Sequence, residues 1–565
     1  MKKLLALLIA MCMVASLAAC GGSGSSGGDA TEAAAETEAA GGDEAEAPAE
    51  TEAAGGDEAE APAQAGDNTV VIAVISGFSA MDPAYVYETT PTLMVNACYE
   101  TLYKFDTGVD TPQPCLVDSC EFSEDGKDVT MKLKPEVKFA SGNDMTSADV
   151  AFSLMRLKNI KGNPSFLMDN VESVEVVDDD TFIIHQTTAD SSLLAKLTYG
   201  SCSIVDSQVV KEKGGTDAED ASTADTARDY LDTTSAGSGM YIMTSYVPDE
   251  EMILEKNYDY WGEQTNVDKY IIRFEGDANT QMMGLKAGDV DIALNLNDDT
   301  MDELEGAENV TTENTPTKTI SFIMMNEDPE IGGPVSNKLV QQAIRLAVDY
   351  EGMQNVCGRG AITPKSIFQV GFLGSAGELD VATARDLDKA KELLAEAGYP
   401  DGFDIDLPVS DLDMEGLPML DVAQKVKEDL SEIGINVNIV QQNWSGGYGD
   451  AYRAGDLGFS VMYWGIDYND PNVQLAFLPG ESVGLRCRWQ AEGYEPVIEK
   501  MNEIIQETDD TARGEKLLEI QDMIADDCPW IVVAQASSHI GYSNRLEGVA
   551  FTDVYRVDIR TINVK

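Results

Sequence analysis

The stretch EFSEDGKDVTMKLKPEVKFASGNDMTSADVAFSLMR, at Glu121–Arg156, gives the clearest indication of the fold. In its first half, Asp128–Leu133 alternates polar and apolar residues after a turn of acids and glycine, as a half-buried strand does. In its second half, Thr146 and Asp149 have the spacing of a capping box, which predicts a helix over Ala148–Leu157. The stretch therefore predicts a strand followed by a capped helix, the start of an α+β arrangement.

Strand and helix patterns continue on both sides of this stretch. The first half of the chain favours an α+β arrangement, with elements predicted over Asn68–Ile75, Thr90–Tyr103, Val171–Val177, Thr181–Gln186, Gly237–Met243 and Met252–Leu254. In the second half helices and strands alternate, over Lys338–Val348, Asp388–Ala397, Phe403–Leu407, Leu420–Ile433, Ile435–Val440, Ala512–Ile524 and Trp530–Ala534. The change predicts a second lobe of α/β type. The C-terminal strands are expected to return to the first lobe, which leaves a cleft for a ligand.

The N-terminus predicts export and attachment to a membrane. Two lysines precede an apolar run over residues 4–17 that is too short to span a bilayer as a mature helix, and Leu17–Cys20 reads LAAC. The pattern resembles a bacterial lipobox, with residues 1–19 as a signal peptide that is removed before Cys20. Cys20 is then expected to carry acyl chains that tether the protein to the outer face of a membrane. An ordinary secretory signal is the alternative.

Residues 20–67 are expected to form a disordered acidic linker. The unit ETEAAGGDEAEAPA occurs at Glu36–Ala49 and again at Glu50–Ala63, and no aromatic residue, Lys or Arg lies between Gly21 and Asp67. Such a composition buries too little apolar surface to fold. The linker would hold the folded body away from the membrane, and a low-complexity tract without a role is the alternative.

Length and charge restrict the function. About 500 residues follow the linker, more than one hydrophobic core usually organises, so two or more lobes are expected. The chain has 100 acidic and 38 basic residues, for a formal charge of −62. The stretch 21–68 holds thirteen of the acids, so most of the negative charge belongs to the folded body. This charge argues against nucleic acid and other polyanions as partners.

Cysteines and histidines indicate no metal site or catalytic centre. Seven cysteines follow the linker, an odd number, and the closest pair, Cys115 and Cys120, is a candidate for a disulfide. The two histidines, His185 and His539, have no ligand-spaced neighbours, and neither a nucleophile elbow nor a phosphate loop occurs. We therefore expect no metal, no cofactor and no enzymatic activity.

Short motifs now place the chain beside a known family. From about residue 68 to the end, it resembles the extracellular solute-binding proteins of ABC importers, family 5, which bind peptides, nickel and related solutes. Besides Glu121–Arg156, the motifs lie in the family's order at Ser79–Pro83, Asn96–Phe105, Gly237–Tyr241, Asn257–Gly262, Gly284–Ala293, Val340–Met353, Asp386–Phe403 and Tyr463–Asn472. Each motif is weak alone, but their order over the whole body makes the resemblance strong.

The resemblance implies a two-lobed periplasmic-binding-protein-like α/β fold with a ligand cleft between the lobes. Lobe I would comprise residues 68–112, 200–317 and 540–565, an accessory subdomain 113–199, and lobe II 318–539. It also implies a monomer that closes over its solute by a hinge motion and delivers it to a membrane permease and its ATPase. Oligopeptides or dipeptides are the expected solutes.

The sharpest site prediction concerns MYWGIDYNDP at Met462–Pro471. In peptide-binding relatives, the acid three residues after this tryptophan pairs with the α-ammonium group of the peptide. Asp467 holds that place after Trp464 and is flanked by Tyr463. A carboxylate in a closed cleft needs a partner, which an ammonium ion supplies. The alternative is that Asp467 only stabilises the following turn.

Other site residues follow from the same resemblance. Trp444 would line a side-chain pocket, while Ser79 and Met81 would form the opposite wall; packing in the lobe surface or the core is the alternative for Trp444 and Met81.

Two arginines of relatives are missing: the one that some peptide binders place three residues before the tryptophan is Val461 here, and the one that grips the peptide carboxylate in dipeptide binders has no counterpart in Leu420–Ile433. Arg453 and Arg486 are the nearest candidates for an anion contact, with an ordinary surface position as the alternative.

Other ligand classes stay open at this point. A nickel chelate, haem or an oligosaccharide would suit other members of the binding class. An exported hydrolase is the alternative from a different class.

Overall fold

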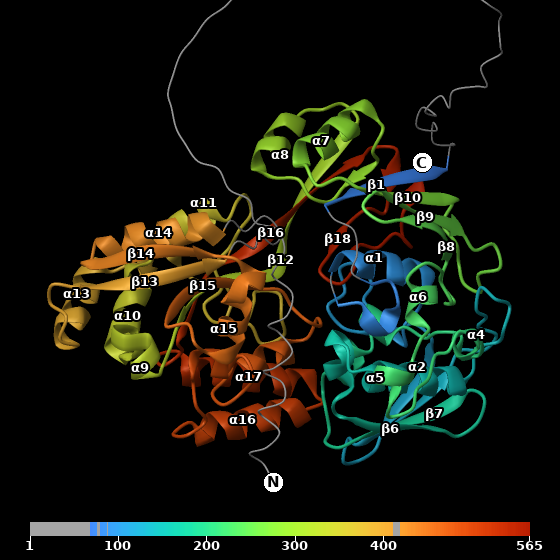
Figure 1. Ribbon diagram of the computed structural model, residues 1–565, viewed down its shortest axis with the longest axis horizontal. Coiled ribbons are helices and arrows are strands. Elements are labelled where there is room, and N and C mark those ends of the chain that lie inside the picture. Colours follow the sequence, from blue (N-terminus) through green and yellow to red (C-terminus); the bar gives the residue numbers. More distant parts are fainter. Residues whose placement is uncertain (1–67, 76–79, 88, 411–418) are drawn as a thin grey trace, which may run out of the picture. The chain divides into compact units, whose positions relative to one another are not determined.

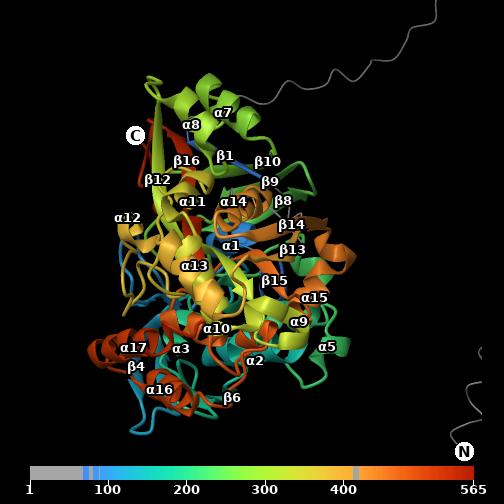
Figure 2. The same ribbon diagram turned by 90° about the vertical axis from the view of Figure 1, so that its left-hand side faces the viewer.

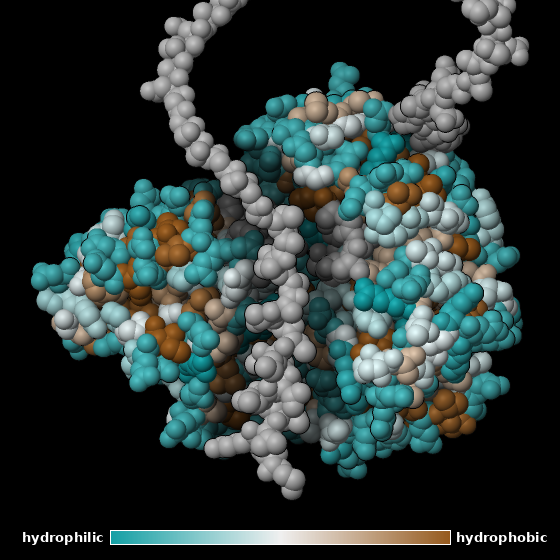
Figure 3. Space-filling view, in the orientation of Figure 1, coloured by the Kyte–Doolittle hydropathy of each residue, from teal (hydrophilic) through white to brown (hydrophobic). Residues whose placement is uncertain are grey.

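The computed structural model describes residues 68–75, 80–87, 89–410 and 419–565. All of them belong to one compact unit, residues 64–565. The signal peptide, Cys20, the acidic linker and Ser79 lie outside the described residues. Figure 3 shows a face on which hydrophilic residues predominate and hydrophobic ones form small scattered groups.

One mixed sheet of eight strands organises the described body. Its order is β15-β12-β16-β11-β1-β10-β9-β8. Both β12 and β16 are long and pair antiparallel (Figure 1). The bounds are β1 Thr69–Val74, β8 Tyr241–Val247, β9 Glu251–Lys256, β10 Lys269–Phe274, β11 Ile292–Ala293, β12 Val310–Met325, β15 Phe459–Trp464 and β16 Trp530–Ser543. The sheet confirms that a C-terminal strand returns to the first half of the chain.

Lobe I is the part built around the core cluster that contains Val70, Tyr241, Tyr270 and Ile559. Strands β1 and β8–β11 lie in it, and β12 and β16 enter it. Its principal helices are α1 Thr89–Cys98, α4 Ser207–Glu212, α6 Arg228–Leu231, α7 Ala278–Ala287 and α8 Asp298–Leu304. The parallel pairing of β1 with β10 was not predicted, because KYIIRF in β10 is short and lies 200 residues from β1, and no local pattern encodes a pairing at that separation.

The accessory subdomain has its own core and an antiparallel sheet of order β4-β5-β7-β6. Its elements are β4 Val117–Phe122, β5 Asp128–Leu133, β6 Val171–Val176, β7 Thr181–Gln186, α2 Ser147–Ile160 and α3 Leu193–Lys196. The predicted capping box is present, since the Thr146 backbone N–H donates to Asp149 Oδ2 at 2.8 Å. The strand and capped helix of Glu121–Arg156 are thereby confirmed.

Lobe II is the part built on the far ends of β12 and β16, β15 and the parallel pair β13 and β14. Side chains alternate along β12, so that Ile323 and Met325 enter one core and Phe322 and Met324 the other. Helices cover both faces, as in an α/β lobe. The bounds are β13 Phe403–Ser410, β14 Ile435–Gln442, α10 Lys338–Ala347, α11 Tyr350–Val356, α13 Leu387–Glu396, α14 Met419–Ser431, α15 Gly449–Ala454, α16 Glu495–Gln506 and α17 Asp510–Ile524.

Two strands join the lobes, and their pairing is interrupted midway. The register of β12 against β16 shifts between Pro316 and Ile320. At this point the buried Gln535 amide donates to the carbonyls of Thr317 and Val370, and its Oε1 accepts from the Val370 N–H. The side chain thus replaces ladder hydrogen bonds that the irregular strands lose.

Two details differ from the sequence predictions. Strand β8 starts at Tyr241, four residues later than expected, because Gly237 and Gly239 pack against the backbone of Cys98 and leave no room for a Cβ. The seven cysteines of the described residues are all free thiols, so Cys115 and Cys120 form no disulfide. All but Cys120 are buried.

Candidate functional site

A cavity of about 500 Å³ lies where lobe I, the accessory subdomain and lobe II meet. Its size is typical of small-molecule sites. Aromatic side chains dominate its wall, together with two carboxylates, Asp467 and Asp553, and two guanidinium groups; Asp553 is paired with Lys318. The lining residues are Tyr87, Asn163, Tyr199, Thr319, Trp444, Tyr452, Arg453, Met462, Tyr463, Trp464, Gly465, Ile466, Asp467, Arg486 and Asp553.

Strand β15 positions the central part of this wall. Its Val461 is buried in one lobe II core, and the alternation of the strand turns Met462 and Trp464 towards the other. The Trp464 ring meets Phe477 edge-on, with centroids 5.2 Å apart. Because Trp464 is fixed in this way, Asp467 emerges at a defined place three residues beyond it.

Asp467 is hydrogen-bonded to Tyr87 across the lobes. The Tyr87 hydroxyl donates to Asp467 Oδ1 at 2.5 Å, although the two residues are 380 positions apart in the chain. Tyr87 follows a short 3₁₀ helix, Pro83–Tyr85, in lobe I, whereas Asp467 follows β15 in lobe II. The cavity therefore has a charged group at the junction of the lobes.

Burial sets the protonation chemistry of this pair. Loss of water raises the pKa of Asp467, and the Tyr87 hydrogen bond and the Arg486 charge act against that rise. Burial also raises the pKa of Tyr87, and the neighbouring Asp467 raises it further, so that its hydroxyl remains a donor. A ligand cation would favour the ionised form of Asp467 and offset the solvation free energy that the carboxylate loses on burial.

Arg486 lies between two aromatic rings of the cavity. Its guanidinium carbon is 4.9 Å from the Tyr452 centroid and 5.3 Å from that of Trp464, within cation–π range. Among the described residues it forms no ion pair. Arg453 differs: its side chain is 56% exposed, lies 3.6 Å from Asp450, and stacks at 5.1 Å on Trp444. Arg486 is therefore the better placed of the two to meet an anionic group.

Trp444 forms the outer part of the aromatic wall. It starts a single π-type turn, Trp444–Tyr448, instead of simply ending β14. Its ring lies 6.0 Å from Tyr448 and 6.3 Å from Tyr452, tilted to both. The wall thus offers flat apolar surface beside the charges.

Six of the eight ligand contacts predicted from the sequence line this one cavity: Asp467, Trp464, Tyr463, Trp444, Arg453 and Arg486. Met81 does not line it, because its side chain is 2% exposed in the lobe I core. Tyr87, Tyr199, Tyr452 and Asp553 were missed, since no local pattern separates them from packing residues. Their places in the cavity depend on contacts between distant segments.

The segment that carries Tyr87 is held from the accessory subdomain. Asp82 caps the 3₁₀ helix by accepting from the Ala84 N–H, and it accepts two hydrogen bonds from Arg156 of α2, at 2.6 and 2.8 Å. Arg156 also binds Asp225 at 2.7 and 3.0 Å. Asp82, which belongs to the family motif at Ser79–Pro83, therefore anchors the residues that lead to Tyr87.

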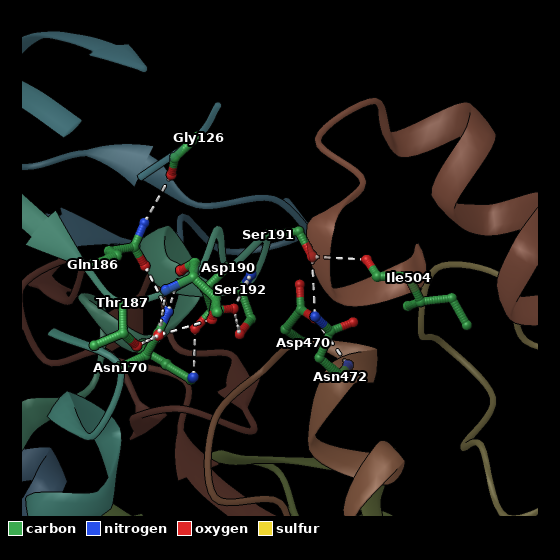
Figure 4. A network of polar contacts seen from close by, with 12 residues as sticks. Gly126, Asn170, Gln186, Thr187, Asp190, Ser191, Ser192, Asp470, Asn472 and Ile504 are labelled. Atoms are coloured by element: carbon green, nitrogen blue, oxygen red, sulfur yellow. Dashed lines mark hydrogen bonds and ion pairs between the residues drawn. The ribbon is translucent and has the colours of Figure 1, made fainter. Parts of the chain in front are cut away.

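The accessory subdomain touches lobe II at a second place, drawn in Figure 4. The Ser191 N–H donates to the Ile505 carbonyl at 2.8 Å. The Ser191 hydroxyl donates to the Ile504 carbonyl at 3.2 Å, and the Asn472 amide donates to Ser191 Oγ at 3.0 Å. Asp470, the N-cap of the 3₁₀ helix Pro471–Phe477, binds the buried Arg513 of α17 at 2.9 Å. Figures 1 and 2 both place α16 and α17 at the end of the body opposite α7 and α8.

Other kinds of site find little support in the described part of the chain. There, no group of three or more His, Cys, Asp or Glu side chains is arranged to hold a metal ion. His185 pairs with Asp128 and Glu175 in the accessory sheet, and His539 with Asp298 in lobe I. Over the same residues, no helix combines the length and apolar character needed to cross a membrane.

Comparison with known proteins agrees with this fold. The family described as "Bacterial extracellular solute-binding proteins, family 5 Middle" matches residues 111–483. Heme-binding protein A of Haemophilus influenzae is 26% identical over 86% of this chain and 90% of its own length. The dipeptide-binding protein of Escherichia coli is 24% identical, with coverages of 78% and 84%. The Helicobacter pylori periplasmic binding protein DppA, solved with the peptide STSA, superposes with a TM-score of 0.70 at 22% identity, covering 88% of this chain and 98% of that one.

A two-lobed binding protein with an aromatic, charged cavity at the lobe junction is the class that the fold and site define. The chain belongs to family 5 of the bacterial extracellular solute-binding proteins. This confirms the resemblance noted in the sequence and the extracytoplasmic binding role of the family.

Proposed function

We propose that this protein is the lipid-anchored substrate-binding component of an ABC importer, and that it captures oligopeptides, dipeptides or other amine-bearing solutes. The observation that carries the proposal is Asp467, a carboxylate half-buried in an aromatic cavity between the lobes. A charge in such a place is costly unless a counter-ion joins it, and an α-ammonium group is the counter-ion that fits.

The rest of the cavity suits a zwitterion with apolar side chains. Arg486 offers a guanidinium without an ion-pair partner among the described residues, for a carboxylate or a carbonyl oxygen. Trp444, Tyr452 and Trp464 offer faces for side chains. Relatives named for dipeptide binding and a solved relative with a bound peptide support the same ligand class.

The proposal includes location and partners. Cys20 would carry the lipid anchor, residues 20–67 would act as the tether, and the body would stand outside the cytoplasm as a monomer. The permease and ATPase of an importer would receive the solute. Lobe I would comprise residues 68–112, 200–317 and 540–565, the accessory subdomain 113–199 and lobe II 318–539. With these bounds, Tyr87 and Asp467 would lie on opposite sides of the cleft that closes over the solute.

A double-mutant cycle tests the ammonium contact. First, the solute that co-purifies is released by denaturation and identified by mass spectrometry. Its affinity and that of its N-acetylated form are then measured by calorimetry for the wild type and for Asp467→Asn. Each single change should cost about 2–5 kcal/mol, and the two losses should not add, because both remove one interaction. Full additivity, or tight binding of the acetylated solute, would refute the contact.

The other ligand classes give different results in the same preparation. Haem or a nickel chelate would show in the absorption spectrum of the purified protein, and an oligosaccharide would bind Asp467→Asn as well as the wild type. Turnover of the solute on incubation would indicate a hydrolase.

A further inference from the structure

The Tyr87 hydroxyl is hydrogen-bonded to one of the two carboxylate oxygens of Asp467, the residue proposed to bind the ligand. This hydroxyl donates to Asp467 Oδ1, and among the described residues Tyr87 is the one hydrogen-bond partner that Asp467 has. Oδ2 therefore has no protein donor within the described chain. Asp467 lies on the wall of the cavity, so this oxygen is the acceptor that a ligand can reach without competing with a protein donor.

Contacts from the accessory subdomain hold Tyr87 in this place. The Tyr199 hydroxyl donates to the Tyr87 carbonyl at 2.8 Å. Phe166 meets the Tyr87 ring edge-on, with centroids 6.2 Å apart and planes at 88°. Five residues earlier, Asp82 is fixed by Arg156. Tyr87 is thus held at both its backbone and its ring in the protein without ligand.

The number of free carboxylate oxygens matters for cation recognition. A guanidinium group binds a carboxylate best through two parallel N–H···O bonds that use both oxygens. An ammonium group is a compact charge with three rotatable donors, and it needs one good acceptor. A carboxylate whose first oxygen is already taken by a phenol keeps its full attraction for an ammonium group but loses the two-oxygen geometry that a guanidinium prefers.

We propose that Tyr87 is a specificity-determining residue of the cavity, and that by occupying Oδ1 it makes Asp467 select primary ammonium groups over guanidinium groups. This inference rests on the proposed function, since it needs Asp467 to hold the ligand cation. It adds a residue of lobe I to the recognition of a group bound by lobe II.

The test uses a random library of di- and tripeptides with natural N-termini, from which lysine and arginine are omitted. A second portion has its N-terminal amines converted to guanidinium groups, which keeps the charge and changes the geometry. Equal amounts of the two portions compete for the full chain, and mass spectrometry measures the retained ratio. The variants are Tyr87→Phe, Asp467→Asn and the control Tyr85→Phe, which alters a phenol of the same segment outside the cavity lining.

The wild type and Tyr85→Phe should retain ammonium peptides over guanidinium peptides by roughly tenfold, the worth of one hydrogen bond to a charged group. In Tyr87→Phe the ratio should fall towards one. An unchanged ratio in Tyr87→Phe, with binding still dependent on Asp467, would overturn the inference and leave the proposed function standing. Retention of neither portion by any variant, or equal retention by Asp467→Asn, would overturn the proposed function and this inference with it.

Discussion

Arg156 and Asp82 form a buried bidentate ion pair, in which two guanidinium nitrogens donate to the two carboxylate oxygens at 2.8 and 2.6 Å. Arg156 is 1% exposed and Asp82 fully buried. Asp225 completes the arrangement, and its pKa is held below the ordinary value mainly by Arg156, against the effect of burial. The pair joins α2 of the accessory subdomain to the segment of lobe I that ends at Tyr87.

Replacing Arg156 by Met should destabilise the protein strongly. The change leaves two carboxylates buried without a counter-ion, which typically costs about 3–5 kcal/mol. Urea denaturation followed by circular dichroism measures it. The control is Arg359→Met, which breaks the exposed pair with Asp302 and should have little effect. Equal stability of the two variants would contradict the role of Arg156 as an anchor.

Ligand affinity should fall as the pH is lowered through the pKa of Asp467. Burial raises this pKa in the empty protein, so the loss should begin above the ordinary aspartate value of about 3.9. The ammonium ligand binds the ionised form, and binding in this range should release protons. The stability of the protein without ligand should show the opposite pH dependence. Its folded state binds more protons than the unfolded state, so stability falls as the pH rises through the same window.

Calorimetry at several pH values, in buffers of different ionisation enthalpy, measures both the affinity and the protons released. Asp467→Asn should bind weakly and without pH dependence in this window. If the variant kept the wild-type pH profile, another group would be responsible.

Arg486 should contribute more to binding than Arg453. Arg486 is half-buried between Tyr452 and Trp464 with no ion-pair partner among the described residues, whereas Arg453 is exposed beside Asp450. Arg486→Gln should weaken peptide binding roughly tenfold or more, and amidation of the peptide C-terminus should remove most of that difference. Arg453→Gln serves as the matched variant and should change affinity much less. Equal effects of the two would place the carboxylate elsewhere.

The contact of Ser191 with Asn472 should slow ligand release. It joins the accessory subdomain to the lobe II turn that follows Asp467, so it stabilises the arrangement in which the cavity is enclosed. Asn472→Ala should raise the dissociation rate about two- to tenfold, the range of one neutral hydrogen bond. Ser191→Ala should do the same, and the double variant should add little.

Stopped-flow tryptophan fluorescence measures this rate. Ser482→Ala, at an exposed position of lobe II, is the control. Unchanged dissociation in both single variants would show that the contact does not hold the cavity closed.

Cys20→Ser should release the protein from the membrane. Without the thiol no acyl chain can be attached, and no apolar stretch after residue 20 reaches the length needed to span a membrane. Cell fractionation with a labelled fatty acid measures the result, and Cys98→Ser, at a buried position in lobe I, controls for loss of a thiol. A Cys20→Ser protein that stayed in the membrane fraction and carried label would refute the lipobox.

The sequence predicted the elements whose side chains follow a regular period, and it predicted the lobe II half of the site. Asp467, Tyr463 and Trp464 share one short motif, so their proximity is local. Tyr87 and Tyr199 reach the same cavity only because the lobes meet, and no local pattern encodes that contact. The long strands β12 and β16 were also underpredicted, since they pass through a register shift where Gln535 replaces the usual ladder.

The free cysteines give four of the hydrophobic cores a chemical probe of their own. Cys98 lies in the lobe I core, Cys202 in the accessory core, and Cys357 and Cys487 in the two cores of lobe II. Burial raises the pKa of Cys98, Cys202 and Cys357 to about 12, so an alkylating reagent meets almost no thiolate in the folded state. Brief exposure to the reagent in rising urea, followed by peptide mapping, would therefore record the order in which the cores open, with no engineered label in the chain.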